Sequence, residues 1–164
     1  MWTLMDSPVG ELRIVEQGGA ISAIEFSPFR DSTGRESTGR PLGDRDDAHP
    51  VLAEAKRQLT AYFDRDLKEF DLPLAPIGTP WQKSVWDQLL AVGYGETASY
   101  GQIAARLGKS NAASRAVGTA NGSNPIPIVI PCHRVIGADG TLTGYAGGVE
   151  RKQTLLELEQ DALF

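Results

Sequence analysis

The sequence has few of the residues that bind metals or form cross-links. It contains one cysteine, Cys132, and two histidines, His49 and His133. One cysteine excludes an internal disulfide, and three such residues are too few for an ordinary structural zinc site. Apolar runs of the ~20 residues that span a bilayer are absent, as are the basic region and apolar stretch of a signal peptide. We therefore expect a cytoplasmic protein without membrane attachment, in which Cys132 is either inert packing or the site of chemistry.

Positive charge is also scarce, but its distribution is uneven. The net charge is -5 over 164 residues, which by itself argues against nucleic-acid binding. Residues 77–164 carry seven Lys/Arg and seven Asp/Glu, so the whole excess of acid lies in residues 1–76. Between Ser99 and Ala138 there is no acidic residue, and the basic ones are Arg106, Lys109, Arg115 and Arg134. This segment predicts a modest positive surface that suits a nucleic acid.

The first half has the pattern of a small sheet with a helix. Residues 1–26 alternate imperfectly between apolar and polar and contain two turn signals, which predicts three short antiparallel strands. Residues 30–48 hold a near-repeat of Ser-Thr-Gly-Arg with little apolar content, which is typical of a mobile surface loop. Helical spacing of apolar residues predicts a helix over 50–63 that packs on the sheet. We expect residues 64–78 to form a strand and a proline-rich linker.

The second half has the start signals of three helices. Thr79-Pro80-Trp81-Gln82 combines a capping box with proline at the first helical position. Ser99 to Gln102 forms a second capping pattern, for a short helix that Gly108 ends. Ser110 can cap a third helix over 111–120. Two short helices joined by a tight turn are typical of a helix-turn-helix, although such a pair can also be ordinary packing.

Residues 124–134, NPIPIVIPCHR, carry the most information about chemistry. Their three prolines exclude a helix and a central strand, while their apolar content indicates burial. We expect a stiff, extended segment that carries Cys132 inward, followed by the polar residues His133 and Arg134. A thiol must become a thiolate to attack, and a neighbouring base or positive charge promotes this. Because adjacent residues of an extended chain point to opposite faces, the pattern does not guarantee direct contact between Cys132 and His133, and a water can bridge them.

The last helix, about 150–163, places a carboxylate in an apolar stripe. Glu159 falls in the middle of a stripe formed by Leu155, Leu156, Ala162 and Leu163. A buried carboxylate is costly unless it is paired. His133 could be its partner and would then be oriented by it. An arginine, a backbone group or Lys152 is an equally good candidate, and the sequence leaves these alternatives open.

Six segments of the second half, taken together and in order, are similar to one known family. They are residues 78–82 (GTPWQ), 95–101 (GETASYG), 114–118 (SRAVG), 124–125 (NP), 130–136 (IPCHRVI) and 144–148 (GYAGG). The chain thereby resembles the methylated-DNA–protein-cysteine methyltransferases, which repair alkylguanine. Residues 1–76 resemble the variable amino-terminal domain of this family only in length and pattern.

This resemblance implies a fold and an activity. The fold is mixed α/β (α+β), with a ribonuclease H-like amino-terminal domain over 1–76. A winged helix-turn-helix alkyltransferase domain follows over 77–164, with the helix-turn-helix at about 99–120. The activity is DNA repair by direct reversal, in which the alkyl group of O6-alkylguanine, and also of O4-methylthymine, moves once to Cys132 and inactivates the protein.

The resemblance also assigns roles to residues at the catalytic centre. Cys132 is the acceptor, His133 the base that acts through water, and Glu159 the residue that orients His133. Tyr100 meets the flipped base and donates a proton as the base departs. Asn124 braces the recognition helix against the segment that carries Cys132.

Further residues are assigned to DNA and substrate. Arg115 enters the duplex where the extruded nucleotide was, because the alkyl group is out of reach inside the stack. The recognition helix then lies in the minor groove of double-stranded DNA. The remaining contacts to base and DNA fall on Ser99, Ala116, Val135, Tyr145, Ala146 and Gly147. Some relatives hold zinc in the amino-terminal domain, but this chain has no cysteine there, so we expect no zinc and no dissociable cofactor. We expect a monomer that can cluster on DNA.

Two rival functions use the same residues differently. A Cys-His hydrolase would attack a carbonyl with the same thiolate and be regenerated by water, so turnover distinguishes it. A binding module, either a helix-turn-helix regulator or an alkyltransferase-like protein, would hold lesions without reacting. Relatives of the latter kind lack the acceptor cysteine, which is present here.

Overall fold

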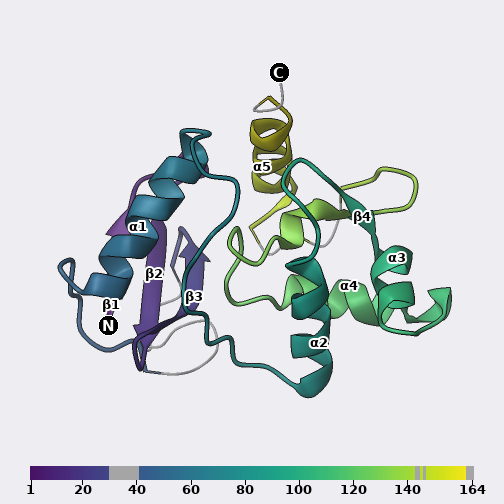
Figure 1. Cartoon of the computed structure of the whole chain (residues 1–164), viewed down its shortest axis with the longest axis horizontal. Coiled ribbons are helices and arrows are strands. Elements are labelled where there is room, and N and C mark those ends of the chain that lie inside the picture. The colour runs from purple at the N-terminus through teal and green to yellow at the C-terminus, as the bar shows by residue number, and fades with distance from the viewer. Residues whose placement is uncertain (30–40, 143–144, 146, 162–164) are drawn as a thin grey trace. The chain divides into compact units, whose positions relative to one another are not determined.

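The computed structural model describes residues 1–29, 41–142, 145 and 147–161 of the chain. These residues fold as parts of two compact units, Met1–Ile77 and Gly78–Phe164 (Figure 1). Among the helices of the described ranges, none is long and apolar enough to cross a membrane.

The first unit is built on a three-stranded antiparallel sheet. Its strands, β1 (Trp2–Met5), β2 (Leu12–Gln17) and β3 (Ala20–Phe26), lie in the order β1-β2-β3. Gly18 and Gly19 join β2 to β3 with φ angles of 61° and 85°. Two successive positive φ angles suit a tight hairpin, and glycine adopts them without strain. The prediction of three short antiparallel strands is confirmed.

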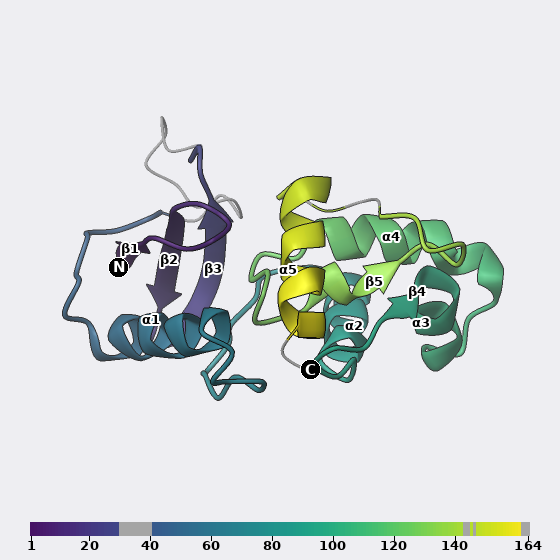
Figure 2. The ribbon, with the colours of Figure 1, turned by 90° about the horizontal axis from the view of Figure 1, so that it is seen from above.

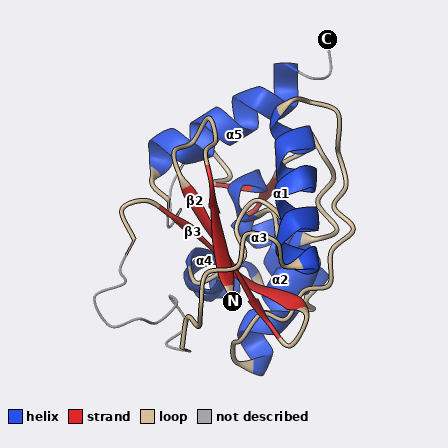
Figure 3. Cartoon of the chain, turned by 90° about the vertical axis from the view of Figure 1, so that its left-hand side faces the viewer, coloured by secondary structure: helices blue, strands red, loops and turns tan. Residues whose placement is uncertain are grey.

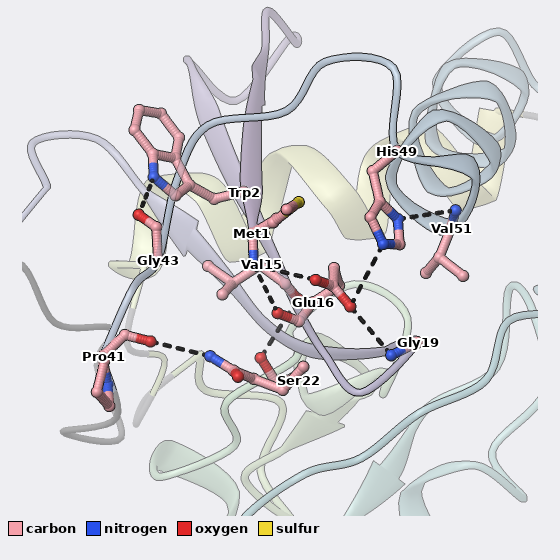
Figure 4. Close-up of polar contacts among 11 residues, drawn as sticks. Met1, Trp2, Val15, Glu16, Gly19, Ser22, Pro41, Gly43, His49 and Val51 are labelled. Atoms are coloured by element: carbon pink, nitrogen blue, oxygen red, sulfur yellow. Dashed lines mark hydrogen bonds and ion pairs between the residues drawn. The ribbon is translucent and has the colours of Figure 1, made fainter.

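Helix α1 (Pro50–Phe63) covers one face of this sheet (Figure 3). The apolar stripe that predicted the helix is buried, with Leu52, Ala55, Leu59 and Tyr62 all at 0% exposure. His49 caps the helix because its Nδ1 accepts a hydrogen bond from the backbone N–H of Val51 at 3.3 Å (Figure 4). The predicted helix is therefore confirmed with the bounds 50–63.

A polar cluster joins the end of β2 to the start of α1 (Figure 4). The Glu16 carboxylate accepts hydrogen bonds from the Met1 amine and from the backbone N–H of Gly19, each at 3.0 Å. His49 Nε2 lies 3.7 Å from the same carboxylate. Burial raises the pKa of Glu16, but these hydrogen bonds and charges outweigh it and lower the pKa overall. The cluster fixes the β2–β3 turn beside the capped end of α1.

The segment after residue 40 packs against the sheet and pairs with its edge strand β1 through an isolated bridge between Trp2 and Arg45. Leu42 is buried and packs with Val15 and Ala23, and the indole N–H of Trp2 donates to the carbonyl of Gly43 at 3.1 Å. The expectation of a mobile loop is therefore wrong for residues 41–48, because a single leucine is enough to anchor them to the sheet. Residues 30–40 lie outside the described part of the chain.

Residues 64–78 form no strand. Only an isolated bridge joins Leu74 to Ile21, with the Ile21 N–H donating to the carbonyl of Pro73. The predicted strand is wrong because prolines at 73 and 76 lack the N–H groups that a ladder needs.

The second unit begins with two capped helices, as the sequence predicts. Helix α2 (Pro80–Leu89) has a capping box between Thr79 and Gln82, and α3 (Tyr100–Arg106) has one between Ser99 and Gln102. In each box the hydroxyl of the first residue accepts a hydrogen bond from the backbone N–H of the glutamine. The glutamine side-chain oxygen in turn accepts one from the backbone N–H of the first residue. Gly108, at φ 71°, follows the end of α3.

The third helix begins differently from the prediction. A 3₁₀ turn, η1 (Asn111–Ala113), precedes α4 (Ser114–Gly122), and Ser110 makes no capping bond. The Ser114 hydroxyl instead donates to Oδ1 of Asn111 at 3.1 Å. A Cβ atom on Gly101 would come within 2.4 Å of that Oδ1 atom. The missing side chain of Gly101 thus lets η1 approach α3 closely and sets the tight turn between the two helices.

A small parallel pair and a final helix complete the second unit (Figure 2). Strand β4 (Ala98–Ser99) pairs with β5 (Val135–Ile136). Helix α5 (Val149–Asp161) packs on the 3₁₀ turn η2 (Cys132–Arg134). The mixed α/β fold, with an amino-terminal antiparallel sheet and a helical second unit, agrees with the prediction.

Candidate active site

The segment that carries Cys132 is buried but not extended. Ile126, Ile128, Val129 and Ile130 are at most 6% exposed, as predicted. The chain nevertheless turns, because the Ile130 N–H donates to the carbonyl of Ile126 at 2.9 Å and Ile128 has a φ of 74°. The expected rod is therefore wrong: backbone hydrogen bonds between residues of the segment close it into turns that end in η2.

Cys132 is buried, and a backbone hydrogen bond fixes its position. Its side chain is 4% exposed, and its N–H donates to the carbonyl of Ile130 at 2.8 Å. Burial raises the pKa of the Cys132 thiol to about 11, although a hydrogen bond from Asn124 and the charge of Lys152 act in the opposite direction. At neutral pH only about one molecule in 10⁴ would then hold a thiolate. Reaction at Cys132 therefore needs a base that removes the proton as the sulfur attacks.

His133 and Arg134 both bind the carboxylate of Glu159. Nε2 of His133 lies 2.6 Å from Oε2 of Glu159, and the Arg134 guanidinium donates to both carboxylate oxygens at 2.9 and 3.1 Å. The backbone N–H of Gly95 adds a fourth contact at 3.2 Å. The histidine, arginine and backbone partners that the sequence left as alternatives for Glu159 are thus present together.

The pKa values within this group follow from burial and charge. Burial by itself raises the pKa of Glu159, but the hydrogen bonds and charges of His133 and Arg134 outweigh it and lower the pKa to about 2. Burial lowers the pKa of His133, against the opposite effect of Glu159. A neutral His133 therefore donates Nε2–H to the carboxylate and keeps Nδ1 unprotonated. Nδ1 is buried without a hydrogen-bond partner in the described residues, so it can accept a proton.

Arg134 is not part of the positive surface that the sequence predicted. It is 6% exposed, and besides Glu159 it donates to the carbonyl of Val92 at 2.7 Å. The exposed basic residues of the acid-free segment are Arg106, Lys109 and Arg115.

The Asn124 side chain stabilises the turn that precedes Cys132 through two hydrogen bonds to its backbone. Its Nδ2 donates to the carbonyl of Ile130 at 2.8 Å, and its Oδ1 accepts from the N–H of Ile126 at 3.0 Å. Both arms of the amide thus hold the backbone of the segment that delivers the thiol.

A buried lysine, for which the sequence suggests only a pairing with Glu159, lies close to Tyr100 and Val135. Lys152, at 0% exposure, donates instead to the carbonyl of Val135, and its Nζ lies 6.0 Å from the centroid of the Tyr100 ring. Burial lowers the pKa of Lys152 to about 8. Lys152 precedes Leu155 by three residues and Glu159 by seven, so helical spacing alone places it on the buried face. That spacing could have identified it.

The residues assigned to DNA lie in two places, at the starts of α3 and α4 and in the segment just before α5. Arg115 and Ala116 are exposed near the start of α4, and Ser99 is the half-buried cap of α3. Tyr145 is 8% exposed, and Gly147 is half-buried just before α5. Ala146 lies outside the described residues, as do Ala162 and Leu163 of the predicted apolar stripe.

Family models match both parts of the chain. Residues 1–76 match "6-O-methylguanine DNA methyltransferase, ribonuclease-like domain". Residues 80–161 match "6-O-methylguanine DNA methyltransferase, DNA binding domain".

Individual relatives and solved structures agree with these matches. The methylated-DNA–protein-cysteine methyltransferase of Methanosarcina acetivorans is 60% identical over 158 residues, which cover 96% of this chain and 97% of the relative. That of Mycobacterium tuberculosis is 46% identical over 157 residues, covering 95% and 90%. The crystal structure of M. tuberculosis OGT in complex with DNA superposes with a TM-score of 0.83 at 43% identity, covering 98% of this chain and 93% of the other.

Proposed function

The chain belongs to the 6-O-methylguanine DNA methyltransferase family, and we propose that Cys132 is the residue that accepts the alkyl group. Its activity is that of a methylated-DNA–protein-cysteine methyltransferase, and it repairs DNA by direct reversal. Such an activity needs an acceptor cysteine, and the chain has only one. The single observation that carries the assignment is the position of Cys132 beside the buried His133–Glu159 pair.

The transfer is a substitution at the alkyl carbon. Sγ of Cys132 attacks that carbon, the bond between the carbon and O6 of guanine breaks, and the electron pair leaves with the base. The thiol proton passes through a water to Nδ1 of His133, and Glu159 stabilises the imidazolium that forms. Tyr100 donates a proton to the departing guanine. The product is a thioether, which has no good leaving group, so one transfer exhausts the protein.

The substrate is alkylated guanine flipped out of double-stranded DNA, together with O4-methylthymine. A base inside the stack is out of reach, and extruding it costs a few kcal/mol. The exposed guanidinium of Arg115 can occupy the vacated position while α4 lies in the minor groove. Tyr145, Ala146, Gly147, Val135, Ser99 and Ala116 complete the contacts to base and backbone. In this proposal residues 77–164 form the reacting domain, residues 1–76 the amino-terminal domain, and a monomer works in the cytoplasm.

Intact mass spectrometry after incubation with methylated duplex DNA tests the assignment. We expect the protein to gain the mass of one methyl group, to carry it on Cys132, and to stop at one equivalent of lesion. Repair of many lesions by one protein molecule would instead support the Cys-His hydrolase. An unchanged mass with tight lesion binding would support a binding module.

Arg115→Ala is expected to slow repair of methylated duplex DNA at least tenfold, while the reaction with free O6-benzylguanine changes less than twofold. Loss of the side chain removes a group that offsets part of the flipping cost, and the free base needs no flipping. At 1.36 kcal/mol for each factor of ten, tenfold is well within that cost. Single-turnover rates on both substrates measure the effect.

Lys83→Ala is a matched control, because it removes one exposed positive charge from α2 rather than from α4. It should alter neither rate by more than about twofold, as is usual for an isolated surface charge. Equal losses on both substrates in Arg115→Ala would place Arg115 in the chemical step.

A further inference from the structure

Asn121 is a buried amide that the proposed mechanism does not use. It lies near the end of α4 and is 1% exposed, on the buried face that also holds Val117 and Ala120. Asparagine is mostly exposed in proteins, because burying its amide costs free energy unless both ends are hydrogen-bonded. An apolar residue would fill this position at lower cost if packing were all that was required.

One end of the amide binds the backbone of the reactive residue. Nδ2 of Asn121 donates to the carbonyl of Cys132 at 3.3 Å. The same carbonyl accepts the backbone N–H of Val135, so both of its lone pairs are used. This acceptor also fixes the orientation of the amide, since the reversed amide would set two oxygens against each other.

The other end of the amide has no partner. Oδ1 of Asn121 is buried and makes no hydrogen bond with the described residues. An unsatisfied buried acceptor costs about 1–3 kcal/mol, which exceeds the roughly 0.5–1.5 kcal/mol that a net hydrogen bond contributes. Stability therefore does not account for an amide here. Asn124 differs, because both of its arms bind backbone groups of the preceding turn.

We propose that Asn121 is a positioning residue that holds the carbonyl of Cys132, and with it Sγ, in a fixed place relative to α4. This helix also carries Arg115, the residue assigned to the DNA duplex in the proposed function, on which the inference rests. DNA bound along α4 presents the flipped base at a place set by the helix. A tie from α4 to Cys132 then sets the approach of sulfur to the alkyl carbon, where a misplacement of about 1 Å can cost 10²-fold in rate.

Asn121→Leu tests the tie, because leucine keeps the number and branching of the side-chain heavy atoms and removes the amide. We expect single-turnover repair of methylated duplex DNA to slow at least tenfold, and the reaction with free O6-benzylguanine to slow less than threefold, because the free base can adjust its position. The final extent of reaction measures the folded fraction separately from the rate. Wild-type rates on duplex DNA, or equal losses on both substrates, would overturn the proposal.

Asn121→Asp adds a test whose expected result, a pH-dependent rate, would not follow from a purely structural role of Asn121. A protonated aspartic acid can still donate to the Cys132 carbonyl, whereas an ionised one cannot and repels it. The ratio of the variant rate to the wild-type rate should therefore approach one at low pH and fall as pH rises. Cys132, His133 and Lys152 titrate in both proteins, so the ratio removes their common contribution.

Gln153→Glu is the matched control, because it adds a carboxylate at an exposed position of α5. Its rate ratio should not depend on pH. A pH-independent ratio for Asn121→Asp would contradict the proposal while leaving the function intact. Failure of the wild-type protein to methylate Cys132 would instead contradict the proposed function itself.

Discussion

Replacing Cys132 with alanine is expected to abolish alkyl transfer while the protein still binds methylated duplex DNA. The substitution removes the only sulfur nucleophile in the chain apart from the weakly reactive methionine thioethers. Cys132 donates its backbone N–H to Ile130 and accepts from Asn121 and Val135 through its carbonyl, and alanine keeps these backbone bonds. The fold should therefore survive with a loss of about 1 kcal/mol for the small cavity.

Intact mass and fluorescence anisotropy check this expectation on the same protein sample. The mass should not change after incubation with methylated DNA, and the dissociation constant should stay within a few-fold of that of the unreacted wild type. A methyl group found on another residue of Cys132→Ala would show that the acceptor assignment is wrong.

Glu159→Gln is expected to slow transfer at least tenfold and to lower the free energy of unfolding by about 3–5 kcal/mol, the range for breaking a buried ion pair. The charge of Glu159 raises the pKa of His133, so its removal makes His133 a weaker base toward the Cys132 thiol. Each unit by which the pKa of His133 falls corresponds to up to 1.36 kcal/mol of lost driving force for proton removal, or a rate up to tenfold lower. Because the rate rises as His133 loses its own proton, the acid limb of the pH profile of Cys132 alkylation should move to lower pH while its plateau falls.

The structure changes the expected effect of this substitution on stability. From the sequence alone, glutamine at 159 would keep the shape and cost little. In the fold, however, Glu159 accepts from His133, from two nitrogens of Arg134 and from the backbone of Gly95. A glutamine has one acceptor oxygen in place of two, and its NH₂ group would face the donors of a buried cation.

The acid dependence of stability gives a second measurement on the same variant. The pKa of Glu159 is lowered from 4.5 to about 2 in the folded protein. A lowered carboxyl pKa contributes stability that is fully present above the unfolded value and is lost as pH falls through the folded value. Stability of the wild type should thus decline between about pH 5 and pH 2, and Glu159→Gln should lack this part of the decline.

Urea unfolding of both proteins between pH 7 and pH 3 measures the difference. The stability curves of the two proteins should converge as pH falls. If they stay parallel, and if the alkylation profiles also coincide, Glu159 neither binds as an ion nor acts on His133. Glu157→Gln offers a control with the same substitution on the exposed side of α5, where loss of one negative charge should leave the alkylation profile unchanged.

Much of the local structure could be predicted because it depends on neighbours within one helical turn. The capping boxes at Thr79 and Ser99, the glycine turn after β2 and the apolar stripe of α1 all follow from residues a few positions apart. Predictions that assumed a regular backbone were less successful. The extended rod before Cys132 and the strand within 64–78 both fail, because prolines remove N–H donors and the chain then forms turns or isolated bridges.

The sequence by itself determined the family, the single possible cysteine acceptor and the presence of a carboxylate on the buried side of the last helix. Only the tertiary structure decided which partners that carboxylate binds. Glu159 lies 25 and 26 positions from Arg134 and His133 in the chain, beyond the reach of any local rule. Burial is likewise a property of the whole fold: it keeps the proton on Cys132, turns Arg134 inward and places the Asn121 amide against the Cys132 carbonyl.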